Sequence, residues 1–190
     1  IKYYPALYNS IENMATTQVR NKATVIGNLC NAAPSADTAP PLIAYGSEVV
    51  IRSADGERVV PLEDFFKGPG ITDLRENEMV VEVRVPPQED KSFTSYVKFS
   101  HRSRVDIAIV GVAAKVLKEN GVCKDARIVL GAVAPVPMRA KRAEDFVKGK
   151  SIDESVADEA GKIASEESKP ITDVRATKEY RRHLVGVLTK

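Results

Sequence analysis

Two adjacent prolines, Pro86 and Pro87, interrupt the chain directly after the strand-like run MVVEVRV at residues 79–85. Proline has no backbone N–H to donate to a sheet, and it disfavours a helical conformation in the residue before it. The charged stretch QEDKS follows at residues 88–92. Because no regular element continues through this point, we place a domain boundary here and predict two parts, residues 1–87 and 88–190.

Helix and strand signals alternate before the break. Pro5 suits the first turn of a helix whose apolar positions Leu7, Ile11 and Met14 share one face, and this helix is expected to end near Thr17. These spacings predict a short amphipathic first helix.

A second helix and a hairpin follow in the first part. The run TAPPLIAYG at residues 38–46 predicts a short helix, because its two prolines fit a first turn and its glycine fits a left-handed cap. Strands are predicted at 48–53 and 58–62 around the turn ADGE, and PLEDFFKG at 61–68 is expected to add a helical turn.

Strands precede helices after the break. The pattern predicts an antiparallel meander with strands near 93–99, 106–117 and 125–134, and a turn at Asn120-Gly121. Three amphipathic helices are then expected, at 139–147, at 153–165 and after Thr177 as N-cap. The fold class is therefore α+β, with a three-stranded antiparallel sheet packed on helices in the second part.

Composition limits the classes of function. The 190 residues are 43% hydrophobic with a net charge of only +2, so nothing in the charge points to nucleic acid. The longest apolar runs are shorter than the ~20 residues that span a bilayer, so no membrane segment is expected. With two cysteines and no signal peptide, we expect a reducing cytoplasm. The sequence begins with Ile1 rather than Met, so one interpretation is that the chain is a piece of a longer protein.

Metal and hydrolase chemistry lack visible machinery. His101 and His183 are not spaced with other ligands to close a metal site, and Cys30 and Cys123 are fewer than the four thiolates of an iron–sulfur cluster. Neither a G-x-S-x-G elbow nor a Walker loop occurs. We predict no metal and no catalytic residue in this chain.

The stretch NKATVIGNLCNAAPSAD at residues 21–37 combines a glycine and several small residues, which allow the backbone many conformations, with a single acidic residue, Asp37. We expect a strand end at residues 24–26 that turns at Gly27-Asn28, where successive N–H groups suit anionic oxygens. Asp37 then accepts hydrogen bonds from a ligand. The alternative is a plain turn followed by an N-cap at Asp37, and the spacing alone does not decide between them.

Four segments of the chain together resemble a known family. They are QVRNKATVIGNLCNAAPSADTAPPLIAYGSEVVI, DIAIVGVAAKV, ARIVLGAVAPVPMRAKRAE and YRRHLVGVLT, in this order. They look like the FAD-binding medium subunit of molybdenum hydroxylases, the family of xanthine dehydrogenase and carbon monoxide dehydrogenase flavoproteins. The resemblance runs from about Tyr4 to Lys190.

The resemblance implies half of a flavin site. In the family, FAD is bound by two loops, and TVIGN at residues 24–28 resembles the second, which reads approximately T-x-G-G-N. The first loop is not in this sequence, so residues 1–87 are expected to form the second part of the FAD-binding domain, a mixed sheet with helices. Residues 88–190 are expected to form the C-terminal domain. Ile26 stands where the family usually has a glycine, which puts the diphosphate contact at this point in doubt because a β-branched residue resists positive φ.

The implied cofactor contacts are Thr24, Gly27, Asn28, Cys30, Asn31, Asp37, Leu74 and Lys98. The first three would follow the FAD diphosphate and ribityl chain, and the next two would line the same loop. Asp37, Leu74 and Lys98 would lie near the flavin ring, although a core leucine and a solvated strand lysine are the plain alternatives. Cys30 is expected to be a small filler, and the loop HRSRVD at 101–106 is expected to act as a gate.

The implied function is electron transfer. FAD would pass electrons from iron–sulfur clusters to an acceptor such as NAD, with a small iron–sulfur subunit, a large molybdopterin subunit and the missing N-terminal FAD-binding segment as partners. The isolated chain is expected to be inactive. The alternative is a docking or scaffold module that binds no flavin alone.

Overall fold

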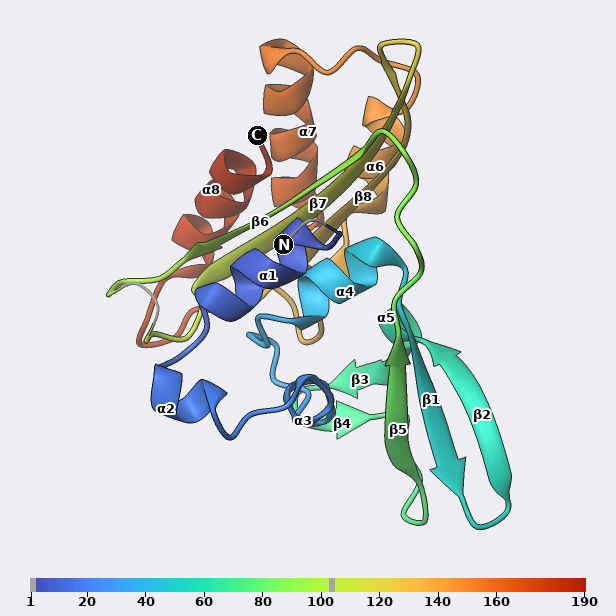
Figure 1. The fold of residues 1–190 in the computed structure, drawn as a ribbon. Coiled ribbons are helices and arrows are strands. Elements are labelled where there is room, and N and C mark those ends of the chain that lie inside the picture. The colour runs from blue at the N-terminus through green and yellow to red at the C-terminus, as the bar shows by residue number, and fades with distance from the viewer. Residues whose placement is uncertain (1–2, 103–104) are drawn as a thin grey trace.

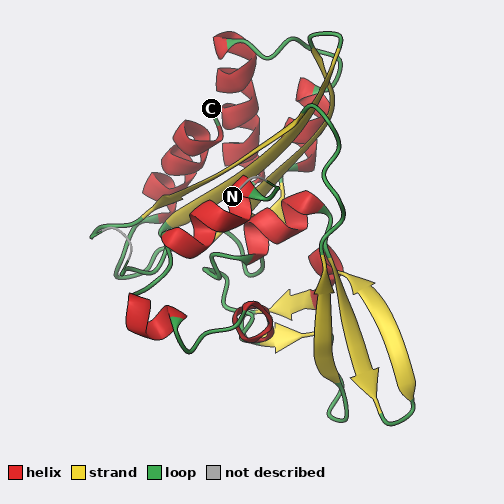
Figure 2. Ribbon diagram, viewed as in Figure 1, coloured by secondary structure: helices red, strands yellow, loops and turns green. Residues whose placement is uncertain are grey.

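The computed structural model describes residues 3–102 and 105–190 of the chain. A four-stranded sheet crosses the molecule diagonally, with helices on both faces, and a smaller sheet projects from one end (Figures 1 and 2). Among the described residues, no helix is both long and apolar enough to cross a membrane.

Helices and strands alternate in the first part, and strands precede helices in the second. The helices of the first part are α1 (Pro5–Glu12), α2 (Thr17–Arg20), α3 (Val25–Cys30), α4 (Ala39–Tyr45) and α5 (Leu62–Phe65). Its strands are β1 (Glu48–Ser53), β2 (Gly56–Pro61), β3 (Phe66–Gly68), β4 (Ile71–Thr72) and β5 (Met79–Arg84). The second part has β6 (Ser92–Phe99), β7 (Val110–Glu119), β8 (Val122–Gly131), β9 (Met138–Arg139), α6 (Lys141–Val147), α7 (Glu154–Glu167) and α8 (Lys178–Thr189).

The predicted elements are largely present, and among the differences one lies near the N-terminus and one in the smaller sheet. The first helix ends at Glu12 rather than near Thr17, and the short α2 follows it. The smaller sheet has the order β2-β1-β5 and is antiparallel throughout, not mixed as predicted. The connection from β2 to β5, residues 62–78, is long enough for a crossover, but it places β5 beside β1, and these two strands run in opposite directions.

The larger sheet is an antiparallel meander in the order β6-β7-β8-β9, which agrees with the α+β class. Asn120 and Gly121 both have positive φ, 52° and 85°, as the predicted tight turn between β7 and β8 requires. The fourth strand, β9, was not predicted because its two residues are too short to show a period. Asp153 and Thr177 cap α7 and α8 through their side chains.

Helices from both parts of the sequence cover the larger sheet. α6 and α8 pack on one face, whereas α1 and α4 pack against β6, β7 and β8 (Figure 1). Every residue of α4 is buried, and its predicted cap Gly46 has φ of 77°. Tyr96, Ala113 and Val129 of the larger sheet belong to the same apolar core as α4 and β1. The boundary at residue 87 remains a prediction.

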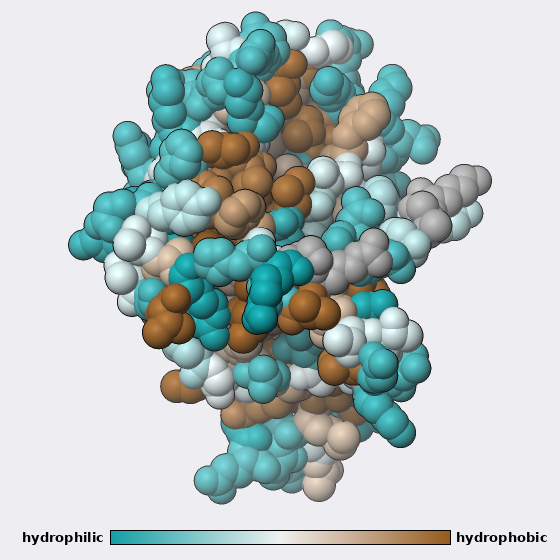
Figure 3. Space-filling view, turned by 90° about the vertical axis from the view of Figure 1, so that its left-hand side faces the viewer, coloured by the Kyte–Doolittle hydropathy of each residue, from teal (hydrophilic) through white to brown (hydrophobic). Residues whose placement is uncertain are grey.

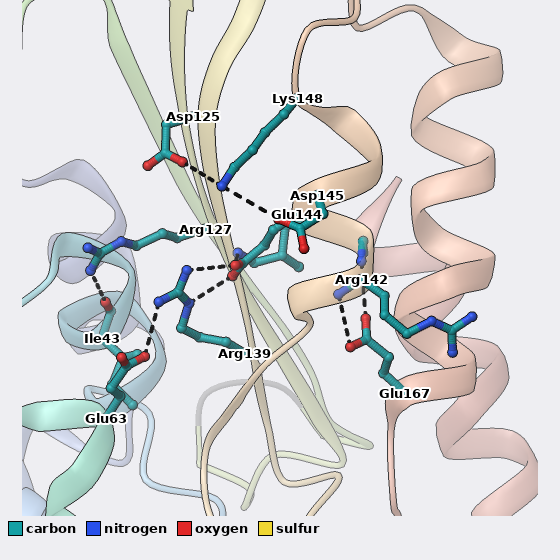
Figure 4. Close-up of polar contacts among 12 residues, drawn as sticks. Ile43, Glu63, Asp125, Arg127, Arg139, Arg142, Glu144, Asp145, Lys148 and Glu167 are labelled. Atoms are coloured by element: carbon teal, nitrogen blue, oxygen red, sulfur yellow. Dashed lines mark hydrogen bonds and ion pairs between the residues drawn. The ribbon is translucent and has the colours of Figure 1, made fainter.

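Two arginines of the larger sheet tie it to the first part of the chain (Figure 4). Arg127 donates to the backbone oxygen of Ile43 at the end of α4, at 3.3 Å. Arg139 pairs with the buried Glu144 at 2.7 Å and with Glu63 of α5 at 3.2 Å. These contacts fix α4 and α5 relative to the sheet.

Helices α7 and α8 approach each other closely at two glycines. A Cβ atom added to Gly161 would lie 2.4 Å from the backbone oxygen of Gly186, whereas one added to Gly186 would lie 3.6 Å from the oxygen of Gly161. We therefore expect Gly161→Ala to destabilise the fold by about 1–3 kcal/mol, because the helices must separate. Gly186→Ala is the matched control and is expected to be neutral or stabilising, since alanine favours a helix. Urea unfolding of both variants measures this, and equal effects would contradict it.

Candidate functional site

The segment expected to end a strand is the start of a helix. Thr24 is the N-cap of α3, and its Oγ1 accepts a hydrogen bond from the backbone N–H of Gly27 at 2.9 Å. The prediction of a strand at residues 24–26 is therefore wrong. Threonine satisfies a helix start better than it satisfies a strand end here, because its hydroxyl takes one of the otherwise unpaired first N–H groups.

Ile26 does not have positive φ, the conformation that a β-branched residue resists and that a glycine at this position would allow. It lies in the first turn of α3, is absent from the residues with positive φ, and packs half-buried on the core. Thr24 and Gly27 beside it are exposed. The side chain of Ile26 is thus directed to the interior while the start of the helix stays accessible.

Asn28 links α3 to the segment that carries Asp37. Its Oδ1 accepts a hydrogen bond from Thr38 Oγ1 at 2.6 Å, which leaves the amide nitrogen of Asn28 as a donor. Asn31, at the end of α3, is exposed. The helix and the acid are therefore parts of one local structure.

Asp37 is the centre of a buried polar cluster. Its Oδ1 accepts from the hydroxyl of Tyr96 at 2.8 Å, and its Oδ2 accepts from Lys98 Nζ at 2.9 Å. The side chains of Asp37 and Lys98 are only 8% and 5% exposed, so Lys98 is not the solvated lysine of the plain alternative. Asp37 is not an N-cap either, because Thr38 occupies that place before α4.

Burial dominates the electrostatics of this cluster. It raises the pKa of Asp37, and the charge and hydrogen bonds of Lys98 and Tyr96 oppose that rise only in part. Burial also raises the pKa of Tyr96 well above its usual range, and the carboxylate of Asp37 adds to the shift. Tyr96 therefore stays protonated and donates to the carboxylate.

A glycine makes room for the cluster. Gly111 lies opposite Lys98 across the β6–β7 pair, and a Cβ atom added there would come within 2.7 Å of the Tyr96 hydroxyl oxygen. Any side chain at this position would displace the hydroxyl that holds Asp37. Sequence reasoning missed Tyr96 and Gly111, although Tyr96 and Lys98 stand two apart on one strand and so share a face.

Cys30 and Leu74 lie on a common core. Both are half-buried and pack against the same set of apolar side chains, which includes Leu29. Burial raises the pKa of the Cys30 thiol, which favours the unreactive protonated form expected of a filler. The residues assigned from the resemblance thus form two groups, one at α3 and one around Asp37, joined through Asn28.

A cavity lies beside the residues that precede Asp37. Its volume is about 280 Å³, and its lining includes Pro34, Ser35, Ile107 and Arg181. His101 Nε2 lies 2.7 Å from the backbone oxygen of Arg175 at the edge of this region. Residues 103–104 of the predicted gate lie outside the described residues.

Figure 3 shows hydrophobic side chains gathered near the middle of one face of the molecule, with hydrophilic side chains around them.

Comparison with known families matches both parts of the chain. The FAD binding domain in molybdopterin dehydrogenase matches residues 1–88, and the CO dehydrogenase flavoprotein C-terminal domain matches residues 95–190.

Individual relatives match nearly the whole chain. A xanthine dehydrogenase FAD-binding subunit from Escherichia coli O157:H7 is 34% identical over 100% of the chain and 65% of the relative. The glyceraldehyde dehydrogenase medium chain of Sulfolobus acidocaldarius is 34% identical over 97% of the chain and 65% of the relative. The chain therefore spans about 65% of the length of these relatives.

Solved structures share the fold. Carbon monoxide dehydrogenase from Hydrogenophaga pseudoflava, in a form that lacks the Mo-pyranopterin moiety, superposes with a TM-score of 0.94 at 32% identity. The match covers 98% of this chain and 65% of that one. Quinoline 2-oxidoreductase from Pseudomonas putida 86 gives a TM-score of 0.88 at 34% identity, over 95% of this chain and 62% of that one.

Proposed function

Because the chain belongs to the family of FAD-binding subunits of molybdenum hydroxylases, we propose that it is the flavoprotein part of an oxidoreductase of that type. The observation that carries this proposal is the close superposition of nearly the whole chain on the carbon monoxide dehydrogenase structure. When bound, FAD carries electrons between the iron–sulfur clusters of a partner and an acceptor such as NAD.

The start of α3 suits the diphosphate of FAD. The N–H of Gly27 is donated to Thr24 Oγ1, whereas the N–H groups of Val25 and Ile26 before it have no partner inside the helix, and such groups favour an anion in front of them. Thr24 and Gly27 are exposed at this end, and Asn28 keeps a free amide donor, so the chemistry of these groups fits. We assign the diphosphate and ribityl contacts to these three residues, with Cys30 and Asn31 along the same helix.

Asp37 and Lys98 are proposed to act as one unit toward the polar groups of the flavin. Each carboxylate oxygen of Asp37 takes one hydrogen bond from Tyr96 or Lys98, and each has capacity for another. Lys98 Nζ donates to Asp37 and to the backbone oxygen of Asn13, which leaves one N–H. Tyr96 holds the carboxylate in orientation, and Leu74 offers an apolar contact from the neighbouring loop.

Partners are proposed to supply the metal centres. The chain has two cysteines, fewer than the four thiolates that a cluster takes, so we assign the clusters to a small iron–sulfur subunit and the molybdenum cofactor to a large subunit. We also expect an N-terminal FAD-binding segment, as part of the same protein or as a separate chain, to complete the flavin site.

A docking or scaffold role without flavin is the second candidate. It is favoured by the mutual pairing of Asp37 and Lys98, which leaves neither charge in need of a ligand. Binding of FAD separates the two candidates.

The decisive experiment is a fluorescence titration with FAD. Residues 1–190 are expected to bind weakly and to be inactive, and the complete subunit is expected to bind tightly, because half of a two-loop site lacks the contacts and preorganisation of the other half. Absence of binding in the complete subunit would contradict the flavoprotein proposal. Tight binding by residues 1–190 would contradict the half-site.

Two neighbouring substitutions test the assignment of α3. In the complete subunit, Gly27→Val is expected to raise the FAD dissociation constant about tenfold, because a Cβ there lies 2.9 Å from Thr24 Oγ1 and displaces the capping hydroxyl. Ile26→Gly is the matched control and is expected to lower stability by about 1–2 kcal/mol through lost burial while FAD affinity stays nearly unchanged. Unchanged affinity in Gly27→Val would remove α3 from the site.

A further inference from the structure

Arg58 binds both ends of the loop at residues 73–78, which carries Leu74. Arg58, on β2, donates from Nη1 to Asp73 Oδ2 at 2.7 Å and from Nη2 to the backbone oxygen of Asp73 at 2.6 Å. Its Nε and Nη2 donate to the two carboxylate oxygens of Glu78 at 2.8 and 2.7 Å. Asp73 and Glu78 bracket the loop between β4 and β5, so all three guanidinium nitrogens of Arg58 are engaged in closing it.

Contacts inside the loop complete the closure. The backbone N–H of Arg75 donates to Glu78 Oε2 at 2.9 Å, and the backbone N–H of Glu78 donates to the oxygen of Arg75 at 3.1 Å. At the other end, Lys67 Nζ lies 3.2 Å from Asp73 Oδ1. Leu74 is therefore held inside a turn whose two ends cannot move independently.

The network differs from an ordinary surface ion pair. Isolated exposed pairs contribute little, but here one fork-shaped group binds two carboxylates and a carbonyl, and the Glu78 side chain is only 6% exposed. The hydrogen bonds from Arg58, and then the one from the backbone of Arg75, lower the pKa of Glu78 to about 2. Arg58 also lowers the pKa of Asp73, so both acids remain charged at neutral pH.

The loop is joined to the proposed flavin site through its leucine. Leu74 packs on the same core as Val25, Ile26 and Cys30 of α3. A displacement of Leu74 would therefore disturb the core on which the helix proposed to meet FAD also packs.

We propose that Arg58 is a positioning residue that fixes Leu74, and through it the apolar wall of the flavin site. This inference rests on the proposed function, because Leu74 matters to FAD only if the chain binds FAD. The proposed effect depends on the geometry of the guanidinium group and not on its charge alone. A lysine at this position keeps the charge but has a single nitrogen, which cannot hold both ends of the loop at once.

The test uses the complete subunit loaded with FAD and compares Arg58→Gln, Arg58→Lys and the control Arg52→Gln. Arg52 lies on the same hairpin, its side chain is 59% exposed, and its guanidinium group pairs with Glu57 at 2.7 Å rather than with Asp73 or Glu78. In both Arg58 variants we expect amide hydrogen exchange at residues 73–78 to become about tenfold faster. We also expect the FAD dissociation constant to rise about five- to tenfold, with a changed visible circular dichroism band of the flavin. The control should change none of these.

The outcomes separate the two proposals. If the unaltered subunit binds no FAD, the proposed function and this inference both fail. If it binds FAD and the Arg58 variants alter hydrogen exchange but neither FAD affinity nor the flavin band, Arg58 is only structural and the inference is overturned. Should the Arg58 variants not fold, Asp73→Asn removes the ion pair between Arg58 and the Asp73 carboxylate and keeps the hydrogen bond to the Asp73 backbone oxygen. For the inference to stand, this variant must then show smaller changes of the same kind in hydrogen exchange, FAD affinity and the flavin band.

Discussion

Lys98→Met is expected to destabilise the folded chain by about 3–5 kcal/mol, because it leaves the buried carboxylate of Asp37 without its charged partner. The ion pair spans 2.9 Å and both side chains are less than a tenth exposed, so water does not replace the lost interaction. Urea or thermal unfolding measures the loss. The exposed pair of Lys124 and Glu119, 3.2 Å apart, provides the control, since Lys124→Met should cost at most about 1 kcal/mol.

A double-variant cycle tests the same explanation. Asp37→Asn combined with Lys98→Met should be much less destabilising than the sum of the two single changes, because no uncompensated charge remains. Additive effects would show that the two groups are not coupled.

The pH dependence has a defined sign. Burial already raises the pKa of Asp37, and without Lys98 that pKa rises further. A raised pKa means that the folded state binds a proton more tightly than the unfolded state, so the stability of Lys98→Met should increase as the pH falls toward the usual range of aspartate. The stability difference between the variant and the original chain should therefore narrow in acid.

This coupling also bears on the choice of variants for the flavin site. Asp37→Ala would remove a proposed ligand contact and at the same time leave the buried Lys98 without its carboxylate partner, so a weaker affinity for FAD would not identify the cause. Asp37→Asn together with Lys98→Met removes both charges and is expected to leave no uncompensated buried charge, which makes it the better probe of the cluster.

Local signals predicted most elements of the fold. The Asn120-Gly121 turn, the Gly46 cap and the N-cap Thr177 each rest on the chemistry of one or two residues, and the structure confirms them. The packing of α1 and α4 on the larger sheet was not predictable in this way, because it depends on contacts between residues far apart in the chain.

The site was harder to predict for two physical reasons. Thr24, Val25 and Ile26 have high strand propensity, but the capping hydrogen bond of Thr24 and the packing of Ile26 on the core outweigh a preference that is weak and depends on context. The partner of Asp37 lies 61 residues away, and a lysine on a strand is usually exposed. The resemblance to a family named Asp37 and Lys98 together, but their pairing came only from the structure.

Glu144→Ala is expected to be as damaging as the loss of Lys98, at about 3–5 kcal/mol, although Glu144 lies outside the proposed flavin site. The carboxylate is 2% exposed, accepts the backbone N–H of Ile128 at 2.8 Å, and pairs with Arg139 at 2.7 Å. Its removal leaves a buried N–H without an acceptor and frees an arginine that also reaches Glu63 of α5.

Two control variants grade this effect. Glu144→Gln should lose less stability, since the amide oxygen still accepts from Ile128, and the exposed Glu166→Ala should lose almost none. Unfolding measurements in that order of severity would support the account, whereas a mild Glu144→Ala would show that Arg139 finds another partner. Because the Arg139 contacts connect the larger sheet to α5, which precedes β3, β4 and the loop that carries Leu74, a severe loss is also expected to weaken FAD binding from a distance.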